Sequence, residues 1–76
     1  MKIIDLLYLL KLAKINNVIL EFNTYDEYLE FKTTKIETTI QDAINYCYSK
    51  GLEDYFVSVY DFLTSRLVSI VCHEDF

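Results

Sequence analysis

The side chains best suited to chemistry lie near the end of the chain, where the sequence reads Cys72-His73-Glu74-Asp75. Thiolate, imidazole and carboxylate groups are zinc ligands, but a structural zinc site needs about four of them around a tetrahedron. Neighbouring residues of a strand point to opposite faces, so these four cannot all converge. Cys47 is far away in the sequence. We therefore expect a solvated terminus with no metal site and no cofactor.

The groups needed for enzymatic catalysis are scarce in this chain. His73 is the only histidine and lies close to the terminus, which is a poor position for a preorganised base. Gly51 is the only glycine, so a glycine-rich phosphate loop is excluded. Two carboxylate pairs, Asp26-Glu27 and Glu53-Asp54, fall in expected loops, where water surrounds them. We expect a protein that is not an enzyme.

A candidate for protein binding rather than catalysis is a segment that combines tyrosine and acidic residues. Its members are Glu21, Tyr25, Asp26, Glu27, Tyr28 and Glu30. Tyrosine is a frequent anchor of protein interfaces, and acids on such a surface steer a basic partner toward it. The competing interpretation is an ordinary solvated hairpin tip. We predict that these six residues form a binding surface for another protein with a basic surface.

The segment Ile3 to Ala13 predicts a helix, running from about Lys2 to Lys14, with two apolar stripes. The main stripe consists of Ile3, Leu6, Leu7, Leu10 and Ala13. The second consists of Ile4, Tyr8 and Leu12. A surface helix needs only one apolar stripe. The second stripe is therefore covered either by the fold or by another copy of the chain, which makes its residues candidates for self-association.

The next stretch predicts a hairpin followed by a second helix. Alternating apolar residues predict strands over 18–23 and 28–33, joined by residues 24–27. Two registers remain open: one pairs Phe22 with Leu29, and the other, slipped by two residues, pairs Glu21 with Lys32. The helix lies within residues 34–47 and its last turn extends to Lys50. We favour a start at Thr39 over Thr34, and Gly51 ends it.

Residues 52–72 allow two interpretations. Their density of Val, Ile, Tyr and Phe favours two strands, over 55–60 and 67–72, whereas the spacing of several apolar residues also fits a helix over 52–71. With two strands the order is α-β-β-α-β-β. We therefore predict a small two-layer α+β domain covering residues 1–76, with a four-stranded antiparallel sheet and two helices on one face. The helical alternative gives α-β-β-α-α.

Composition limits the class of partner. The 76 residues carry a net charge of −5, which argues against nucleic acid because binding phosphates needs a basic surface. The apolar run near the N-terminus is too short to span a bilayer and lacks a cleavage signal, so we expect a cytoplasmic protein without membrane contact. The two cysteines, Cys47 and Cys72, are expected to be buried and reduced.

The acidity, the lone glycine and the lack of catalytic groups make this chain similar in general character to small phage-encoded inhibitors of host proteins. The likeness is one of composition and assigns no residue a role. Our leading hypothesis is a small acidic, non-enzymatic protein that acts by binding another protein, such as a phage- or mobile-element-type inhibitor. The alternative is a self-associating, homodimeric structural module.

Overall fold

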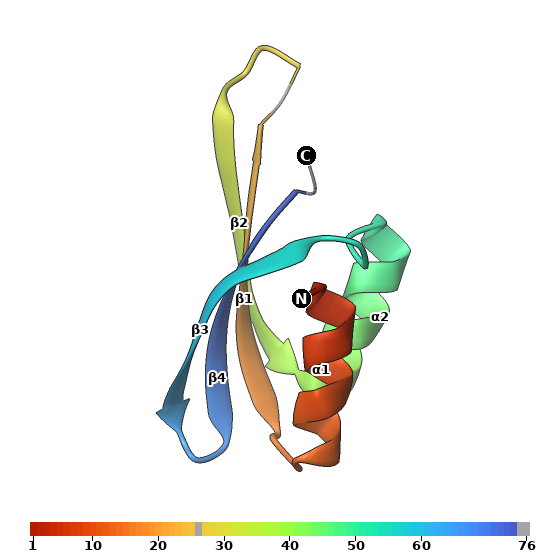
Figure 1. Ribbon diagram of the computed structural model, residues 1–76, viewed down its shortest axis with the longest axis vertical. Helices are drawn as coiled ribbons and strands as arrows, with labels where there is room; N and C mark the ends of the chain where they lie inside the picture. The colour runs from red at the N-terminus through yellow and green to blue at the C-terminus, as the bar shows by residue number, and fades with distance from the viewer. Residues whose placement is uncertain (26, 75–76) are drawn as a thin grey trace.

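A computed structural model describes residues 1–25 and 27–74. Its elements are α1 (Ile3–Leu12), β1 (Asn17–Tyr25), β2 (Phe31–Thr39), α2 (Ile40–Lys50), β3 (Phe56–Thr64) and β4 (Leu67–His73). One sheet carries both helices on the same face (Figure 1). The predicted α+β class and element order are confirmed, and the alternative helix over residues 52–71 is wrong.

The sheet is mixed rather than fully antiparallel. Its strand order is β2-β1-β4-β3, with antiparallel pairing at both sides and parallel pairing between β1 and β4 at the centre. The connection through α2 carries the chain from one edge of the sheet to the other, and β4 then returns beside β1 in the same direction. The prediction of an all-antiparallel sheet is therefore wrong at its central pair, which joins strands far apart in sequence.

The first hairpin differs from both predicted registers. Phe22 faces Thr34, and Glu21 faces Lys35, because β2 begins at Phe31 rather than at residue 28. Opposite charges on facing strands are favourable, whereas the predicted register with Phe22 opposite Leu29 would set Glu21 opposite Glu30, two like charges. Thr33 Oγ1 also donates a hydrogen bond to Asn23 Oδ1 across the strands, at 3.0 Å. The threonines and isoleucine of residues 33–39 suit a strand because their branched side chains pack well on a pleated surface.

The ends of α2 agree with the prediction. The Thr39 side chain accepts a hydrogen bond from the backbone N–H of Asp42 at 3.2 Å, so the helix begins at the later of the two candidate caps. Gly51 adopts a left-handed φ of 68°, and the Leu52 N–H donates to the carbonyl of Cys47 at 2.8 Å. These two features stop the helix and satisfy one of its last carbonyl groups.

The second hairpin has longer strands than predicted and a turn at residues 65–66. The β3 strand is irregular at two places, where the register shifts between Val57 and Val59 and between Phe62 and Thr64. The start of the chain lies along the first part of β3: the Ile3 N–H donates to the Tyr55 carbonyl at 2.7 Å, and the Val57 N–H donates to the Met1 carbonyl at 2.8 Å.

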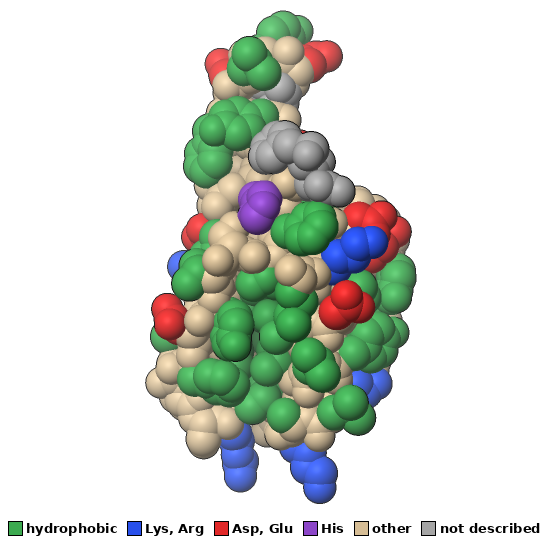
Figure 2. Space-filling view, in the orientation of Figure 1, with side chains coloured by type: hydrophobic (Ala, Val, Ile, Leu, Met, Phe, Trp, Pro, Cys, Tyr) green, Lys and Arg blue, Asp and Glu red, His purple; other side chains and the backbone are tan. Residues whose placement is uncertain are grey.

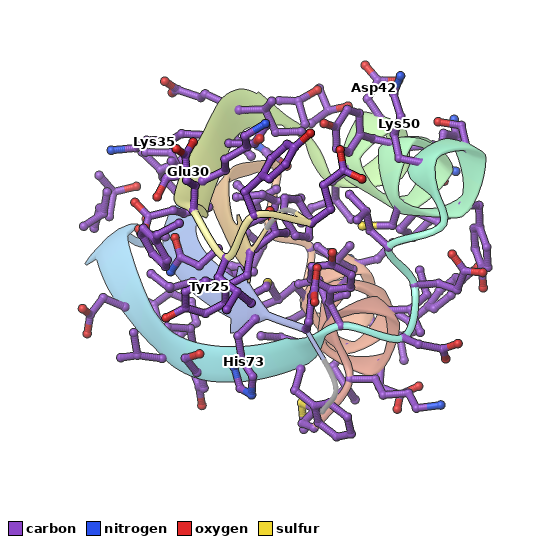
Figure 3. All side chains as sticks on the ribbon, turned by 90° about the horizontal axis from the view of Figure 1, so that it is seen from above. Tyr25, Glu30, Lys35, Asp42, Lys50 and His73 are labelled. Carbon is purple, nitrogen blue, oxygen red and sulfur yellow. The ribbon has the colours of Figure 1, made fainter. Side chains whose placement is uncertain are left out.

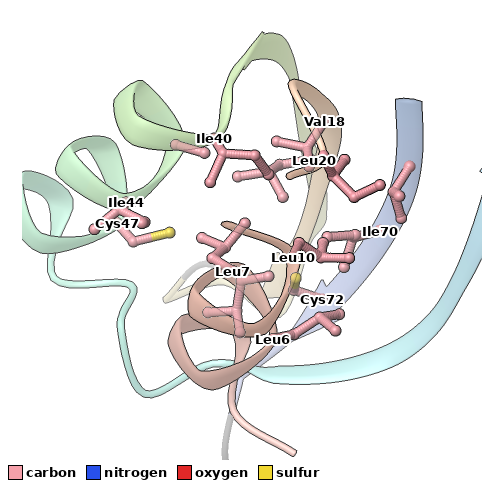
Figure 4. Close-up of a cluster of buried hydrophobic side chains, with 14 of the residues drawn as sticks. Leu6, Leu7, Leu10, Val18, Leu20, Ile40, Ile44, Cys47, Ile70 and Cys72 are labelled. Carbon is pink, nitrogen blue, oxygen red and sulfur yellow. The ribbon is translucent and has the colours of Figure 1, made fainter. Parts of the chain in front are cut away.

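The core lies between the two helices and the central strands (Figure 4). Its fully buried members are Ile3, Leu7, Val18, Leu20, Ala43, Cys47, Val68, Ile70 and Cys72. Both cysteines are free thiols, as predicted. Burial raises the pKa of Cys47 to about 11, with the Glu53 carboxylate as a second cause, and raises the pKa of Cys72 to about 12. In the described part of the chain, neither helix has the length and apolar character needed to cross a membrane.

Candidate protein-binding surface

The β1–β2 hairpin projects beyond the rest of the molecule. Residues 17–23 of β1 pair with β4, so Thr24 and Tyr25 pair with β2 alone. Figure 1 shows the hairpin extending past both helices, and the molecule measures 39 × 22 × 19 Å. The end of this hairpin is therefore an arm supported mainly by its own two strands. We call residues 24–32 of this arm, apart from residue 26, the hairpin tip.

Four large apolar side chains are exposed at the hairpin tip. Tyr25 is 51% exposed, Tyr28 77%, Leu29 80% and Phe31 59%. Tyr25 and Phe31 face each other across the two strands, with ring centroids 5.6 Å apart in an edge-to-face arrangement. Leu29 adopts a φ of 61°, a left-handed conformation that costs energy for a residue with a side chain. The tip thus combines a braced aromatic pair with a strained, exposed leucine.

The structure gathers most of the predicted protein-binding residues at this tip. Tyr25, Glu27, Tyr28 and Glu30 lie there, all exposed. Glu21 lies further down β1, about 13 Å from Tyr25 along an extended strand, opposite Lys35. Asp26 falls outside the described residues. The acids and hydrophobic side chains of the tip appear together at the top of Figure 2, and Figure 3 shows Tyr25 and Glu30 set away from the two helices.

Leu29 and Phe31 were not among the predicted contact residues, because the alternation in a strand over 28–33 places both on its inward face. The strand begins at Phe31 instead, so Leu29 belongs to the turn and Phe31 to the start of β2. The β-branched run from Thr33 to Thr39 was the signal that pointed to a later strand.

The second apolar stripe of α1 is divided between three environments. Ile4 is partly buried against the core. Tyr8 is 45% exposed and lies beside Tyr48 of α2, and a hydrogen bond between these two hydroxyls raises the pKa of Tyr48. Leu12 is 80% exposed. The predicted self-association residues therefore do not form one continuous exposed strip.

The groups near the C-terminus are held apart. Cys72 points into the core, His73 Nδ1 lies 2.5 Å from Ser58 Oγ, and the Tyr55 hydroxyl donates to Glu74 Oε1 at 3.1 Å. Within residues 1–25 and 27–74, no group of His, Cys, Asp and Glu side chains is arranged to hold a metal ion.

The contact between Ser58 and His73 was not predicted from the sequence. A serine beside a histidine is a possible nucleophile and base, but catalysis also needs an orienting group and a site for the substrate. The part of the chain that the structure describes contains no detectable pocket. His73 is instead stacked on Phe56, with ring centroids 6.3 Å apart, which fits a structural contact at the sheet edge.

Comparison of the chain with family models, with curated proteins and with solved structures finds no match.

Proposed function

We propose that this protein is a small, non-enzymatic module that acts by binding another protein, with the hairpin tip as its contact surface. One observation carries the proposal: Tyr25, Tyr28, Leu29 and Phe31 are all more than half exposed on an arm that projects from the body. Large apolar side chains gathered at one exposed place mark interaction sites, because leaving them in water is unfavourable. An aromatic cluster of this kind is a frequent binding hot spot.

The surroundings of the tip favour a protein partner with a basic rim around an apolar groove. Glu27 and Glu30 flank the apolar side chains, and the whole chain carries a charge of −5. Acids around an apolar centre attract a basic protein surface and accelerate its association. The same acids repel phosphate groups, which argues against nucleic acid as the ligand. An arm of this shape suits an inhibitor that fills a functional groove of its target, such as a host protein targeted by a phage or mobile element.

The proposal is tested by comparing two variants as bait in affinity purification from cell lysate. The double change Tyr28→Ala and Phe31→Ala removes aromatic rings from the tip. The control, Tyr48→Ala, removes an exposed tyrosine from α2, where it is 53% exposed. We expect a partner retained by the wild type and the control and lost from the double variant.

With the partner identified, each tip substitution should weaken binding by about 1–2 kcal/mol or more. Equal retention by all three folded proteins would refute the tip as the contact surface.

A further inference from the structure

The outer edge of β3 is only partly covered. Residues 1–3 run along its beginning, as the hydrogen bonds at Tyr55 and Val57 show. Beyond Val57, nothing within residues 1–25 and 27–74 pairs with this edge. We call residues 58–64 the open edge of β3. An open strand edge presents backbone donors and acceptors to any strand that can align with it.

The register identifies which residues offer these backbone groups. The Val57 N–H points to the outer edge, where it meets Met1, so the pair of Val57 with Cys72 is not hydrogen-bonded. The register shifts by one residue after Val57. Alternation of bonded and non-bonded pairs then directs the N–H and C=O groups of Tyr60 and Phe62 to the open edge.

The opposite edge of the sheet is protected in a way that the open edge is not. Strand β2 carries Lys32, Lys35 and Glu37 along its length, and charged side chains on an edge strand discourage pairing with another chain. Between residues 58 and 64 the only charge is Asp61, and there is no proline or lysine. Of the two edges, β3 is therefore the one suited to pairing.

The side chains beside the open edge form an apolar surface that neither helix covers. Tyr60 faces Ile70 and Phe62 faces Val68, so both rings lie on the helix side of the sheet, yet they are 49% and 56% exposed. The reason is that α2 lies over β1 and β2, and Figure 1 shows the lower part of β3 set away from both helices. Figure 2 shows hydrophobic side chains gathered on the lower part of this face, between the places of β3 and α1 in Figure 1.

Helix α1 continues this apolar surface with Leu9, which is 52% exposed. Lys11 contacts α2 by donating a hydrogen bond to Gln41 at 2.6 Å. At 100° per residue, Leu9 lies on the opposite flank of the helix from Lys11, and so on the side of β3.

We propose that a second copy of this chain occupies the surface, with the two β3 strands paired antiparallel about a twofold axis. The two four-stranded sheets then form one continuous sheet, and each copy's Tyr60, Phe62 and Leu9 pack against those of the other. Twofold pairing places the same surface on both sides, so each copy's open backbone groups and apolar side chains meet their equivalents.

The size of the surface matches what a dimer needs. Five apolar side chains on the two faces of the open edge are about half exposed: Leu9, Tyr60 and Phe62 on the helix side, Val59 on the opposite face, and Leu63. Together they leave on the order of 500 Å² uncovered per copy and on the order of 1,000 Å² for two copies, where specific interfaces begin.

The charges also permit pairing with an identical strand. The open edge has a single acid, Asp61, and every antiparallel register except the one centred on Asp61 keeps the two acids from facing each other. A register centred on Tyr60 sets the Tyr60 backbone groups of the two copies opposite each other and places Asp61 opposite Val59, so the acids do not meet. Most of the chain's negative charge lies outside this segment.

The test is sedimentation of the wild type and two variants across concentrations from low micromolar to millimolar. The wild type is expected to approach 18 kDa, twice its mass of 9.0 kDa. Phe62→Lys places a charge at the open edge and should give a folded monomer. Leu12→Lys adds the same charge at an exposed leucine on the outer side of α1 and should keep the dimer. Circular dichroism verifies that each variant is folded.

Hydrogen exchange of the wild type gives a second readout that does not depend on Phe62→Lys folding. The amides of Tyr60 and Phe62 should become protected as concentration rises, while the hairpin tip is unaffected. A wild type that stays monomeric, with exchange at these amides independent of concentration, overturns the proposal. So does a dimer that persists in folded Phe62→Lys or is lost in Leu12→Lys. Substitutions in the hairpin tip should leave this dimer intact. A failure of the dimer proposal is therefore distinguishable from a failure of the hairpin tip as a binding surface.

Discussion

Alkaline pH should unfold this protein through its two buried thiols. Both cysteines have an ordinary pKa of 9.0, and burial raises the pKa to about 11 for Cys47 and about 12 for Cys72. Above about pH 9 the unfolded chain loses these two protons while the native protein keeps them. Because the native state binds more protons, the free energy of unfolding falls as pH rises through this window, until the native thiols ionise as well.

The size of the effect follows from these values. At about pH 10 both thiols are nearly all protonated in the native state and mostly ionised in the unfolded chain, so each lowers the free energy of unfolding by about 1.4 kcal/mol. The two together remove about 3 kcal/mol, out of the ~4–11 kcal/mol expected for a domain of 76 residues. The loss continues toward the native pKa values, so the protein should be close to unfolding by about pH 11.

The assay is urea unfolding, followed by circular dichroism, at a series of pH values from about 8 to about 10. Tyrosines and lysines also titrate near the top of this range, so the comparison is with Cys47→Ala and Cys72→Ala. Each variant has a cavity and a lower stability, but its dependence on pH should be shallower by about 1.4 kcal/mol per pH unit. A slope that is the same in the wild type and both variants would refute the assignment of alkaline sensitivity to the thiols.

Three other changes separate the roles of individual side chains. Leu7→Ala should lower the free energy of unfolding in urea by about 2–5 kcal/mol because Leu7 is fully buried, whereas Leu12→Ala, at a site 80% exposed, should lower it by under about 0.5 kcal/mol. Similar losses in the two variants would contradict the burial of Leu7. Glu53→Met should raise the free energy of unfolding by about 1–3 kcal/mol, because Glu53 Oε2 is buried with no hydrogen-bond partner among the described residues; a lower melting temperature would count against this. Charge reversal of Glu27 and Glu30 to lysine should slow association with a basic partner and flatten its salt dependence in surface plasmon resonance, leaving dissociation almost unchanged; an unaltered association rate would argue against steering.

Local signals were enough to predict much of this fold. The cap at Thr39 and the left-handed Gly51 fix both ends of α2 through contacts within a few residues, so the sequence contains everything needed to locate them. The alternation of Val18, Leu20 and Phe22 likewise identifies β1 and its buried face. In each case the interactions that decide the structure are close in sequence.

The errors arise where distant segments decide the outcome. The pattern around Leu29 and Phe31 fits an inward-facing strand, but pairing of β1 with Thr33–Thr39 moves the strand and leaves those side chains exposed at the tip. The parallel pairing of β1 with β4 depends on the path of the chain through α2, and the residues of the two strands contain no pattern that indicates this path. The tyrosines and acids of the proposed contact surface were thus predicted from the sequence, whereas its exposed Leu29 and Phe31 followed only from the strand register.

The central position of β4 has a consequence for how the chain folds during synthesis. The hairpin β1–β2 and both helices can form from residues before 51, but β3 touches the first half of the sheet only through β4. While residues 67–73 are still inside the ribosome, the edge of β1 that later pairs with β4 stays unpaired, next to Leu20 and Phe22. Such an intermediate exposes both backbone groups and apolar side chains that attract other chains. Assembly of the core must wait for the last strand, so misassembly is most probable just before that strand emerges from the ribosome.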